Sequence, residues 1–135
     1  MGVDQSGRAA LVVEDDDDVR RVMVEQLLNI GFSVLEAESG DEAIRMLGQL
    51  EFVDLVVSDV VMPGTGGIEV GREARRTFPS AGIVLATGFS TEAGALKDFV
   101  VLKKPWDEAD LVAAVQAAFA VSRAPAPGRE RRLEC

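Results

Sequence analysis

Histidine is absent from the 135 residues of the chain, and cysteine occurs once, as the last residue. Without histidine the chain cannot form a Ser-His-Asp or Cys-His nucleophilic site, nor a zinc site that contains histidine. A single cysteine forms no internal disulfide, and we interpret Cys135 as incidental because a frayed terminal thiol is a poor nucleophile. Any chemistry must therefore use carboxylates, lysines, hydroxyl groups or a bound metal.

The sequence also lacks a membrane span, a secretion signal and an excess of basic residues. No apolar run approaches the roughly 18 residues of a transmembrane helix, and the start of the chain lacks the basic and apolar segments of a signal peptide. Fourteen lysines and arginines stand against 23 aspartates and glutamates, which gives a net charge of −9. A surface this acidic repels phosphate backbones. We therefore expect a cytoplasmic protein that binds no membrane and makes no direct contact with nucleic acid.

The length of 135 residues and the hydrophobic content of 47% predict one globular domain with its own core. Residues 1–8 are interpreted as an N-terminal extension and residues 9–121 as the folded domain. Residues 122–135 are rich in proline, alanine and arginine and show no apolar periodicity, so we expect a disordered or interaction tail.

Between these ends, short apolar runs alternate with stretches of helical periodicity. Strands are expected at residues 10–13, 32–35, 53–58, 83–86 and 99–102. Helices are expected at residues 19–30, 39–50 and 68–78, and again after the last strand, where Asp107 is a candidate N-cap. Only 16 residues separate Thr87 from Lys104, so a helix between the fourth and fifth strands should be short or missing.

Repeated strand-then-helix units with strands this apolar predict an α/β fold in which helices cover both faces of a parallel sheet. The commonest such arrangement of five strands is the flavodoxin-like, doubly wound sheet with the order 2-1-3-4-5. Ligands of this architecture bind beyond the carboxyl ends of the strands, at the switch point between strands 1 and 3. The residues that end these two strands are therefore the first candidates for a site.

Acidic residues occupy both of these strand ends. Glu14 and Asp15 follow the first strand, and Asp59 ends the third. Carboxylates that converge in one crevice repel one another, and a divalent cation such as Mg²⁺ or Mn²⁺ would offset that repulsion. The alternative is a solvated acidic turn, which we assign to residues 16–18, with Asp17 or Asp18 as the helix cap.

Thr87 ends the fourth strand, and Lys103-Lys104-Pro105 ends the fifth. A threonine hydroxyl and a lysine ammonium beside the same crevice would supply a hydrogen-bond donor and a cation for a phosphoryl group. Each residue alone is explained equally well as part of a strand-end turn or as a surface lysine. Their joint placement with the acids is what indicates a function.

Together these residues resemble the receiver domains of two-component response regulators, and the resemblance covers residues 9–121. It is carried by Glu14-Asp15, by Asp59 with Met62-Pro63-Gly64 after it, by Thr87 and by Lys104-Pro105. Glu14 and Asp59 are 45 residues apart, and so are Asp59 and Lys104. No single element is specific, but the set in this order is.

The resemblance implies that Asp59 is the phosphoacceptor, which takes a phosphoryl group from a histidine kinase, a histidine phosphotransfer protein or a small acyl phosphate. It implies that Asp15, Asp59 and the backbone carbonyl of Val61 hold Mg²⁺, or Mn²⁺ in its place. Glu14 would act on the metal directly or through water.

The resemblance also assigns roles to the ends of strands 4 and 5. Lys104, at a candidate cis bond to Pro105, would pair with Asp59 and later with a phosphoryl oxygen, whereas Lys103 would point away because successive strand residues alternate in direction. Thr87 would move its hydroxyl onto the phosphate and so switch the domain. The signal would then pass to a downstream protein that the sequence does not identify.

Two departures from the receiver pattern bear on signalling. Many receivers have an aromatic residue three positions before the lysine; this chain has Val101 there, and Phe99 has the parity to reach the same face. In relatives, residues two positions after the phosphoacceptor and after the threonine orient the hydrolytic water, and here these are the apolar Val61 and Phe89. We expect a signalling phosphoacceptor with at most slow autophosphatase activity, not an enzyme.

Other interpretations stay open. A phosphatase of the haloacid dehalogenase kind would keep Asp59 as nucleophile but needs an acid where the chain has Val61. A degenerate receiver would act as a phosphorylation-independent interaction module, although such proteins usually lack one of the site residues present here. The chain is either a single-domain regulator, which its Met start ten residues ahead of the first strand favours, or a receiver cut from a larger protein such as a hybrid kinase.

Overall fold

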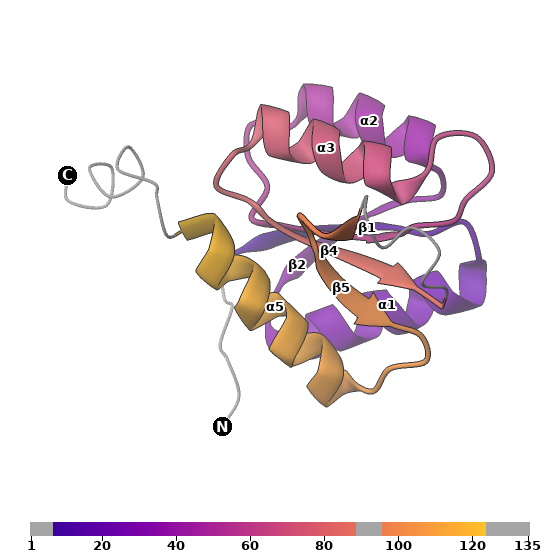
Figure 1. The fold of residues 1–135 in the computed structure, drawn as a ribbon, viewed down its shortest axis with the longest axis vertical. Helices are drawn as coiled ribbons and strands as arrows, with labels where there is room; N and C mark the ends of the chain where they lie inside the picture. Colours follow the sequence, from indigo (N-terminus) through magenta and orange to yellow (C-terminus); the bar gives the residue numbers. More distant parts are fainter. Residues whose placement is uncertain (1–6, 89–95, 124–135) are drawn as a thin grey trace.

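The structure, a computed structural model, describes residues 7–88 and 96–123 (Figure 1). This part of the chain contains five strands: β1 (Ala9–Val13), β2 (Ser33–Ala37), β3 (Leu55–Asp59), β4 (Gly82–Thr87) and β5 (Val100–Lys103). It contains four helices: α1 (Asp17–Ile30), α2 (Gly40–Gln49), α3 (Gly67–Thr77) and α5 (Glu108–Arg123). None of these four helices is long and apolar enough to cross a membrane. The short or missing helix expected between β4 and β5 falls largely on residues 89–95, which lie outside the described residues.

All five strands are parallel and form one sheet in the order β2-β1-β3-β4-β5, which confirms the predicted flavodoxin-like topology. Helices α1 and α5 cover one face of the sheet, and α2 and α3 cover the other (Figure 1). Because successive strand residues point to opposite faces, Val57 packs toward α1 and α5 whereas Val56 packs toward α2 and α3. Burial on both faces explains why the central strands are continuous apolar runs.

The sheet register places the ends of β1, β3 and β4 side by side. Val13 of β1 pairs with Ser58 of β3, so the residues that follow, Glu14 and Asp59, start from adjacent positions. On the other side of β3, Asp59 pairs with Ala86, the residue before the end of β4. The predicted switch point is therefore flanked by the strand ends that carry the candidate site.

The N-cap of α1 is Asp16, so the prediction that Asp17 or Asp18 caps this helix is wrong. The Asp16 carboxylate accepts hydrogen bonds from the backbone N–H groups of Asp18 at 2.9 Å and Val19 at 3.0 Å. An N-cap has an extended backbone and lies two or three residues before the groups it caps, and Asp16 meets both conditions with φ −85° and ψ 120°. The next two acids lie in the first turn, where the helix dipole favours negative charge.

Strand β2 begins one residue later than predicted, because Phe32 takes part in the C-terminal cap of α1. Gly31 has φ 117°, its N–H donates to the carbonyl of Leu28 at 3.0 Å, and the N–H of Phe32 donates to that of Leu27 at 3.1 Å. This pair of bonds is a Schellman motif, which needs a left-handed residue and therefore favours glycine. The first N–H of this segment that donates across the sheet is that of Ser33, to the carbonyl of Arg8 at 2.9 Å.

The other element ends lie within one or two residues of the predicted limits. Asp107 caps α5 as predicted, because its carboxylate accepts a hydrogen bond from the N–H of Asp110 at 2.8 Å. Helix α5 continues to Arg123, two residues into the segment expected to be a tail. Residues 124–135 lie outside the described residues.

Helix α3 begins in close contact with the end of β3. A Cβ atom at Gly67 would lie 2.0 Å from the carbonyl oxygen of Asp59 and 2.9 Å from the Cα of Val60. The N–H of Gly67 also donates to the carbonyl of Val60 at 2.9 Å. Only a residue without a side chain allows the helix to start this close to Asp59.

We therefore expect Gly67→Ala to lower the free energy of unfolding by about 1–3 kcal/mol, because the added methyl group overlaps backbone atoms that cannot move aside freely. Urea denaturation followed by circular dichroism measures this. Gly48→Ala is the matched control: a Cβ atom there meets nothing within 4 Å, and alanine should stabilise α2 by about 0.5–1 kcal/mol. A Gly67→Ala protein as stable as the wild type would contradict the close contact.

Candidate functional site

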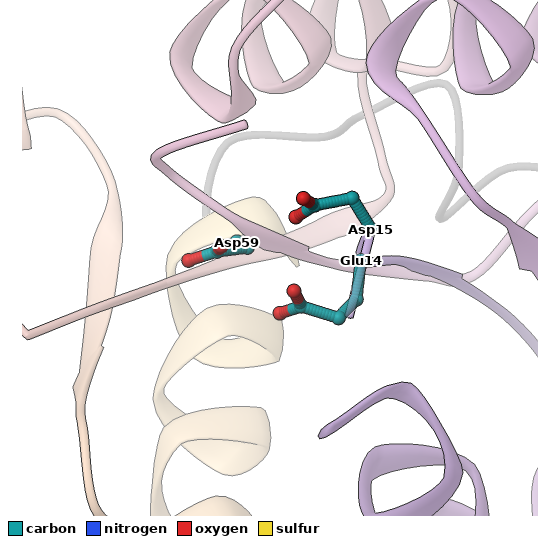
Figure 2. Close-up of side chains that lie close together, drawn as sticks. All are labelled: Glu14, Asp15 and Asp59. Atoms are coloured by element: carbon teal, nitrogen blue, oxygen red, sulfur yellow. The ribbon is translucent and has the colours of Figure 1, made fainter. Parts of the chain in front are cut away.

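Glu14, Asp15 and Asp59 lie together at the switch point (Figure 2). One carboxylate oxygen from each of the three residues lies within 4.8 Å of the other two. Glu14 and Asp15 come directly after β1, and Asp59 is the last residue of β3. Glu14 and Asp59 are buried, whereas Asp15 is exposed. The structure thus brings together the acids that were expected to converge, and leaves one of them open to solvent.

Lys104 is the cation of this cluster. Its Nζ lies 2.9 Å from Oδ1 of Asp59, whose side chain is only 8% exposed. The backbone N–H of Lys104 donates to the carbonyl of Thr87 at 3.0 Å, and the Lys104-Pro105 peptide bond is cis, as expected. Lys103 is exposed and pairs with Thr87 in the sheet. Of the two adjacent lysines, Lys104 is therefore the one that reaches the acids.

The surroundings of Lys104 keep it charged. Burial lowers the pKa of Lys104, but the hydrogen bond and charge of Asp59, together with the charge of Glu14, outweigh burial and leave the pKa raised. The distance from Nζ to Oε1 of Glu14 is 3.7 Å. The ammonium group therefore offsets part of the negative charge of both buried acids.

Glu14 is the most deeply buried member of the cluster, with 1% of its surface exposed. Its Oε2 accepts a hydrogen bond from the N–H of Asp16 at 3.0 Å, but its Oε1 has no hydrogen-bond partner among the described residues. Burial raises the pKa of Glu14; the N–H of Asp16 works against burial, and the negative charge of Asp59 adds to it. Glu14 thus holds a charge at this position only with help from nearby cations.

Two further candidates lie near Asp59. Thr87 is on the neighbouring strand of the sheet, and Val61 follows Asp59 closely in the chain. Thr87 is the last residue of β4, beside β3, and is 5% exposed. Val61 comes two residues after Asp59, and 60% of its surface is exposed. The preceding Val60 donates its N–H to the carbonyl of Ala86 at 2.9 Å, which ties this loop to β4. These placements agree with the expected roles of Thr87 and of the Val61 carbonyl, which stay predictions.

The donor set fits a hard divalent cation. Three carboxylate oxygens converge, and the buried Oε1 of Glu14 lacks a hydrogen bond among the described residues. Mg²⁺ and Mn²⁺ prefer carboxylate, carbonyl and water oxygens, and Mg²⁺ keeps several waters when it binds proteins. The exposed Asp15 provides a solvent-facing side where such waters would lie. The cluster is therefore of the kind that holds Mg²⁺ or Mn²⁺.

Phe99 has the predicted parity but packs far from Thr87. A Cβ atom at Gly71 of α3 would lie 2.8 Å from the ring of Phe99, and the guanidinium of Arg75 lies over the ring at 4.4 Å from its centroid. Since Thr87 pairs with the last residue of β5, Phe99, which precedes β5, lies toward the opposite edge of the sheet. Val101 is 42% exposed. We conclude that Phe99 packs against α3 and does not contact Thr87.

Sequence reasoning missed Arg20, whose side chain contacts the backbone carbonyl of Glu14. Its Nη1 donates to the carbonyl oxygen of Glu14 at 2.9 Å, and its other nitrogens bind Asp17 at 2.6 Å and Glu36 at 3.2 Å. The three-residue spacing of Asp17 and Arg20 is the one local signal for these contacts. The other two depend on how α1 packs beside β2, which spacing along the chain does not predict.

Comparison with protein families finds one match over the core of the chain. Residues 10–116 match the model of the response regulator receiver domain. All the candidate site residues fall within this range: Glu14, Asp15, Asp59, Val61, Thr87 and Lys104.

Two curated relatives come from Brucella abortus. The chain is 36% identical over 107 residues to the response regulator receiver protein CpdR, a match that covers 76% of this chain and 88% of the relative. It is 39% identical over 120 residues to the sensor kinase CckA, a match that covers 84% of this chain but 13% of that protein. The chain thus resembles both a protein of about its own size and one segment of a much longer protein.

Solved structures show the same fold. A response regulator receiver protein from Sinorhizobium medicae superposes with a TM-score of 0.78 at 28% identity, covering 88% of this chain and 98% of that one. The receiver domain of the hybrid histidine kinase CckA superposes with a TM-score of 0.69 at 33% identity, covering 82% of this chain and 98% of that one.

The burial of Glu14 leads to a prediction about pH. Because the pKa of Glu14 is raised above its ordinary value of 4.5 in the folded protein, its contribution to stability is fully present below that pH and is lost as the pH rises through the raised pKa. Glu14→Gln removes this loss, since the amide carries no charge. Without metal, the variant should gain stability relative to the wild type as the pH rises from about 4 to 8.

Urea denaturation in EDTA across this pH range tests the expectation. Glu51→Gln, which neutralises an exposed carboxylate, is the control and should track the wild type. A difference between Glu14→Gln and wild type that does not change with pH would contradict the raised pKa.

Proposed function

The chain belongs to the response regulator receiver domains of two-component signalling, and from this premise we propose that Asp59 accepts a phosphoryl group from a phosphohistidine. A two-component receiver works with a kinase partner, and we infer that the donor is a histidine kinase or a histidine phosphotransfer protein. The observation that supports the proposal most strongly is the position of the Asp59 carboxylate. It lies 2.9 Å from Lys104 Nζ and in one cluster with Glu14 and Asp15.

In the proposed reaction, a carboxylate oxygen of Asp59 attacks the phosphorus of the phosphohistidine. The new O–P bond forms as the P–N bond breaks, and the bonding electron pair stays on the imidazole nitrogen, which takes up a proton from solvent. The Lys104 ammonium pairs with the Asp59 carboxylate before the reaction and with a phosphoryl oxygen after it, so that it neutralises negative charge in both states. The incoming phosphoryl group brings negative charge toward Glu14 and Asp15, which is the main electrostatic obstacle to the transfer.

A Mg²⁺ ion bound at the acids would screen this repulsion and stabilise charge on the phosphoryl oxygens. We infer that Asp15, Asp59 and the backbone carbonyl of Val61 would hold the ion, with Glu14 acting directly or through water. Two observations support this assignment: Oε1 of Glu14 is buried without a hydrogen bond among the described residues, and Asp15 is exposed. Mn²⁺ suits the same oxygen ligands.

After phosphorylation, the Thr87 hydroxyl would bind a phosphoryl oxygen and shift the end of β4, which carries the signal to a downstream protein. Residues 89–95, which follow Thr87 and Gly88, lie outside the described residues. Because Phe99 is fixed between Gly71 and Arg75, we infer that the signal leaves by a route other than rotation of an aromatic residue on β5.

Receivers are typically signalling phosphoacceptors rather than enzymes, and family membership supports this over a haloacid dehalogenase type of phosphatase. The slow autophosphatase activity expected from Val61 and Phe89 stays a prediction, because Phe89 lies outside the described residues. A phosphorylation-independent interaction module remains the alternative that the next experiment distinguishes.

Treatment with acetyl phosphate and Mg²⁺, followed by intact mass, should show the gain of one phosphoryl group. Asp59→Asn should abolish this gain, since the nearly isosteric amide keeps the fold but is no nucleophile. Asp15→Asn should slow the gain at least about tenfold and weaken Mg²⁺ affinity. Even the loss of a group that only orients a metal ligand typically costs about 10–100-fold in metal affinity or activity. Glu25→Gln, an exposed acid on α1, is the control. No mass change in the wild type would favour the interaction module, and rapid release of phosphate would favour the phosphatase.

The two lysines provide a matched pair. Lys104→Ala removes the ammonium group at 2.9 Å from Asp59, and we expect phosphorylation to slow about tenfold, as charged hydrogen bonds contribute 1.5–3 kcal/mol. Lys103→Ala removes an equal charge from an exposed position and should change the rate less than about twofold. The rate of mass gain with acetyl phosphate measures both. Equal effects of the two variants would mean that general charge, not contact with Asp59, accounts for the loss.

A further inference from the structure

Arg20 on the first turns of α1 contacts the backbone behind the acidic cluster. Its side chain is 11% exposed, whereas the neighbouring Arg21 is 64% exposed and pairs with Asp18, itself 89% exposed. The nitrogens of Arg20 reach three oxygens: the carbonyl of Glu14, the carboxylate of Asp17 and the carboxylate of Glu36. We propose that Arg20 is a positioning residue that orients the Glu14–Asp15 peptide and thereby aims both carboxylates at Asp59. The inference rests on the proposed function and adds a residue to it.

The Glu14 residue is held at three points. Its N–H donates to the carbonyl of Ala37 at the end of β2 at 3.1 Å. Its carboxylate accepts from the N–H of Asp16 at 3.0 Å, and its carbonyl accepts from Arg20 at 2.9 Å. The second contact closes a ring that passes through the Glu14–Asp15 peptide, and the Arg20 contact holds the carbonyl of that same peptide. Together they set the plane of the peptide, and the plane sets the direction in which Asp15 leaves the backbone.

Arginine suits this task because its planar guanidinium presents several donors in a fixed geometry. Two of its partners, Asp17 and Glu36, are 77% and 52% exposed, so they hold the guanidinium from the solvent side. The remaining donor, Nη1, points inward to the Glu14 carbonyl. Mutation of groups that orient the ligands of a metal site in this way typically costs about 10–100-fold in metal affinity or activity.

A purely structural role predicts something different. In that case Arg20 would serve to tie α1 to β2 through Glu36, and its loss would reduce stability without a selective effect on the cluster. The two roles are separable because Glu36→Gln weakens the tie to β2 but leaves the Glu14 carbonyl contact in place. Arg21→Met, one residue further along α1, removes the same charge without touching the site.

The test uses Arg20→Met, Arg20→Lys, Arg21→Met and Glu36→Gln in the full chain. Calorimetric titration of the unphosphorylated protein with MgCl₂ measures affinity, and the acetyl phosphate rate across Mg²⁺ concentrations separates affinity from turnover. We expect the Mg²⁺ dissociation constant to rise about tenfold in Arg20→Met, with the rate at saturating Mg²⁺ within about twofold of the wild type. Arg20→Lys, with a single donor group, should lie between, and the two controls should match the wild type.

The outcomes separate this inference from the proposed function. If the wild type binds Mg²⁺ and is phosphorylated, and Arg20→Met and Arg20→Lys bind Mg²⁺ as the wild type does, the positioning role is overturned and the phosphoacceptor function stands. If Glu36→Gln loses as much affinity as Arg20→Met, anchoring of α1 explains the effect and the positioning role is again overturned. If Arg20→Met does not fold, Arg20→Lys decides by the same criterion. A wild type that neither binds Mg²⁺ nor gains a phosphoryl group overturns both.

Discussion

The repulsion between buried carboxylates at the ends of β1 and β3 is the constraint around which the site is built. Adjacent parallel strands place Glu14 and Asp59 side by side, and both are almost inaccessible to water. Two like charges in such a place need cations. Lys104 supplies one, and the open side of the cluster at Asp15 leaves room for a divalent ion. Burial, with the charge of Asp59 adding to it, raises the pKa of Glu14, whereas Asp59 and Glu14 together raise the pKa of Lys104 against the effect of its burial.

The rest of the fold supports the positions of these charged groups without taking part in the chemistry. Helices α1 and α5 seal one face of the sheet, and α2 and α3 seal the other. Gly67 lets α3 start against the carbonyl of Asp59, and Arg20 holds the carbonyl of Glu14 from the opposite side. The two strand ends are thus braced by the backbone contacts of the helices beside them, so that the side chains stay convergent despite their repulsion.

The element boundaries show where local sequence rules are sufficient and where they fail. Hydrophobic periodicity placed every described strand and helix within one or two residues. It failed at α1, where four consecutive aspartates offer several equivalent caps and only the backbone conformation selects Asp16. It failed again at Phe32, an apolar residue next to an apolar strand, because the Schellman bonds make it part of the C-terminal cap of α1.

For the site, the sequence by itself determined the acids and the threonine at the strand ends, because parallel order follows from short-range patterns. Strand alternation showed only that one of the two adjacent lysines faces the crevice, and the choice of Lys104 came from the resemblance to receivers. Tertiary structure alone decided how these groups meet. The 2.9 Å contact of Lys104 with Asp59 joins residues 45 apart in the chain, and the contact of Arg20 with the Glu14 carbonyl joins helix α1 to the end of β1. Burial of Glu14 Oε1 without a hydrogen bond among the described residues likewise follows from packing. Periodicity predicts on which face of a strand or helix a side chain lies. The distance between side chains of different elements depends on how the sheet twists and how the helices pack on it.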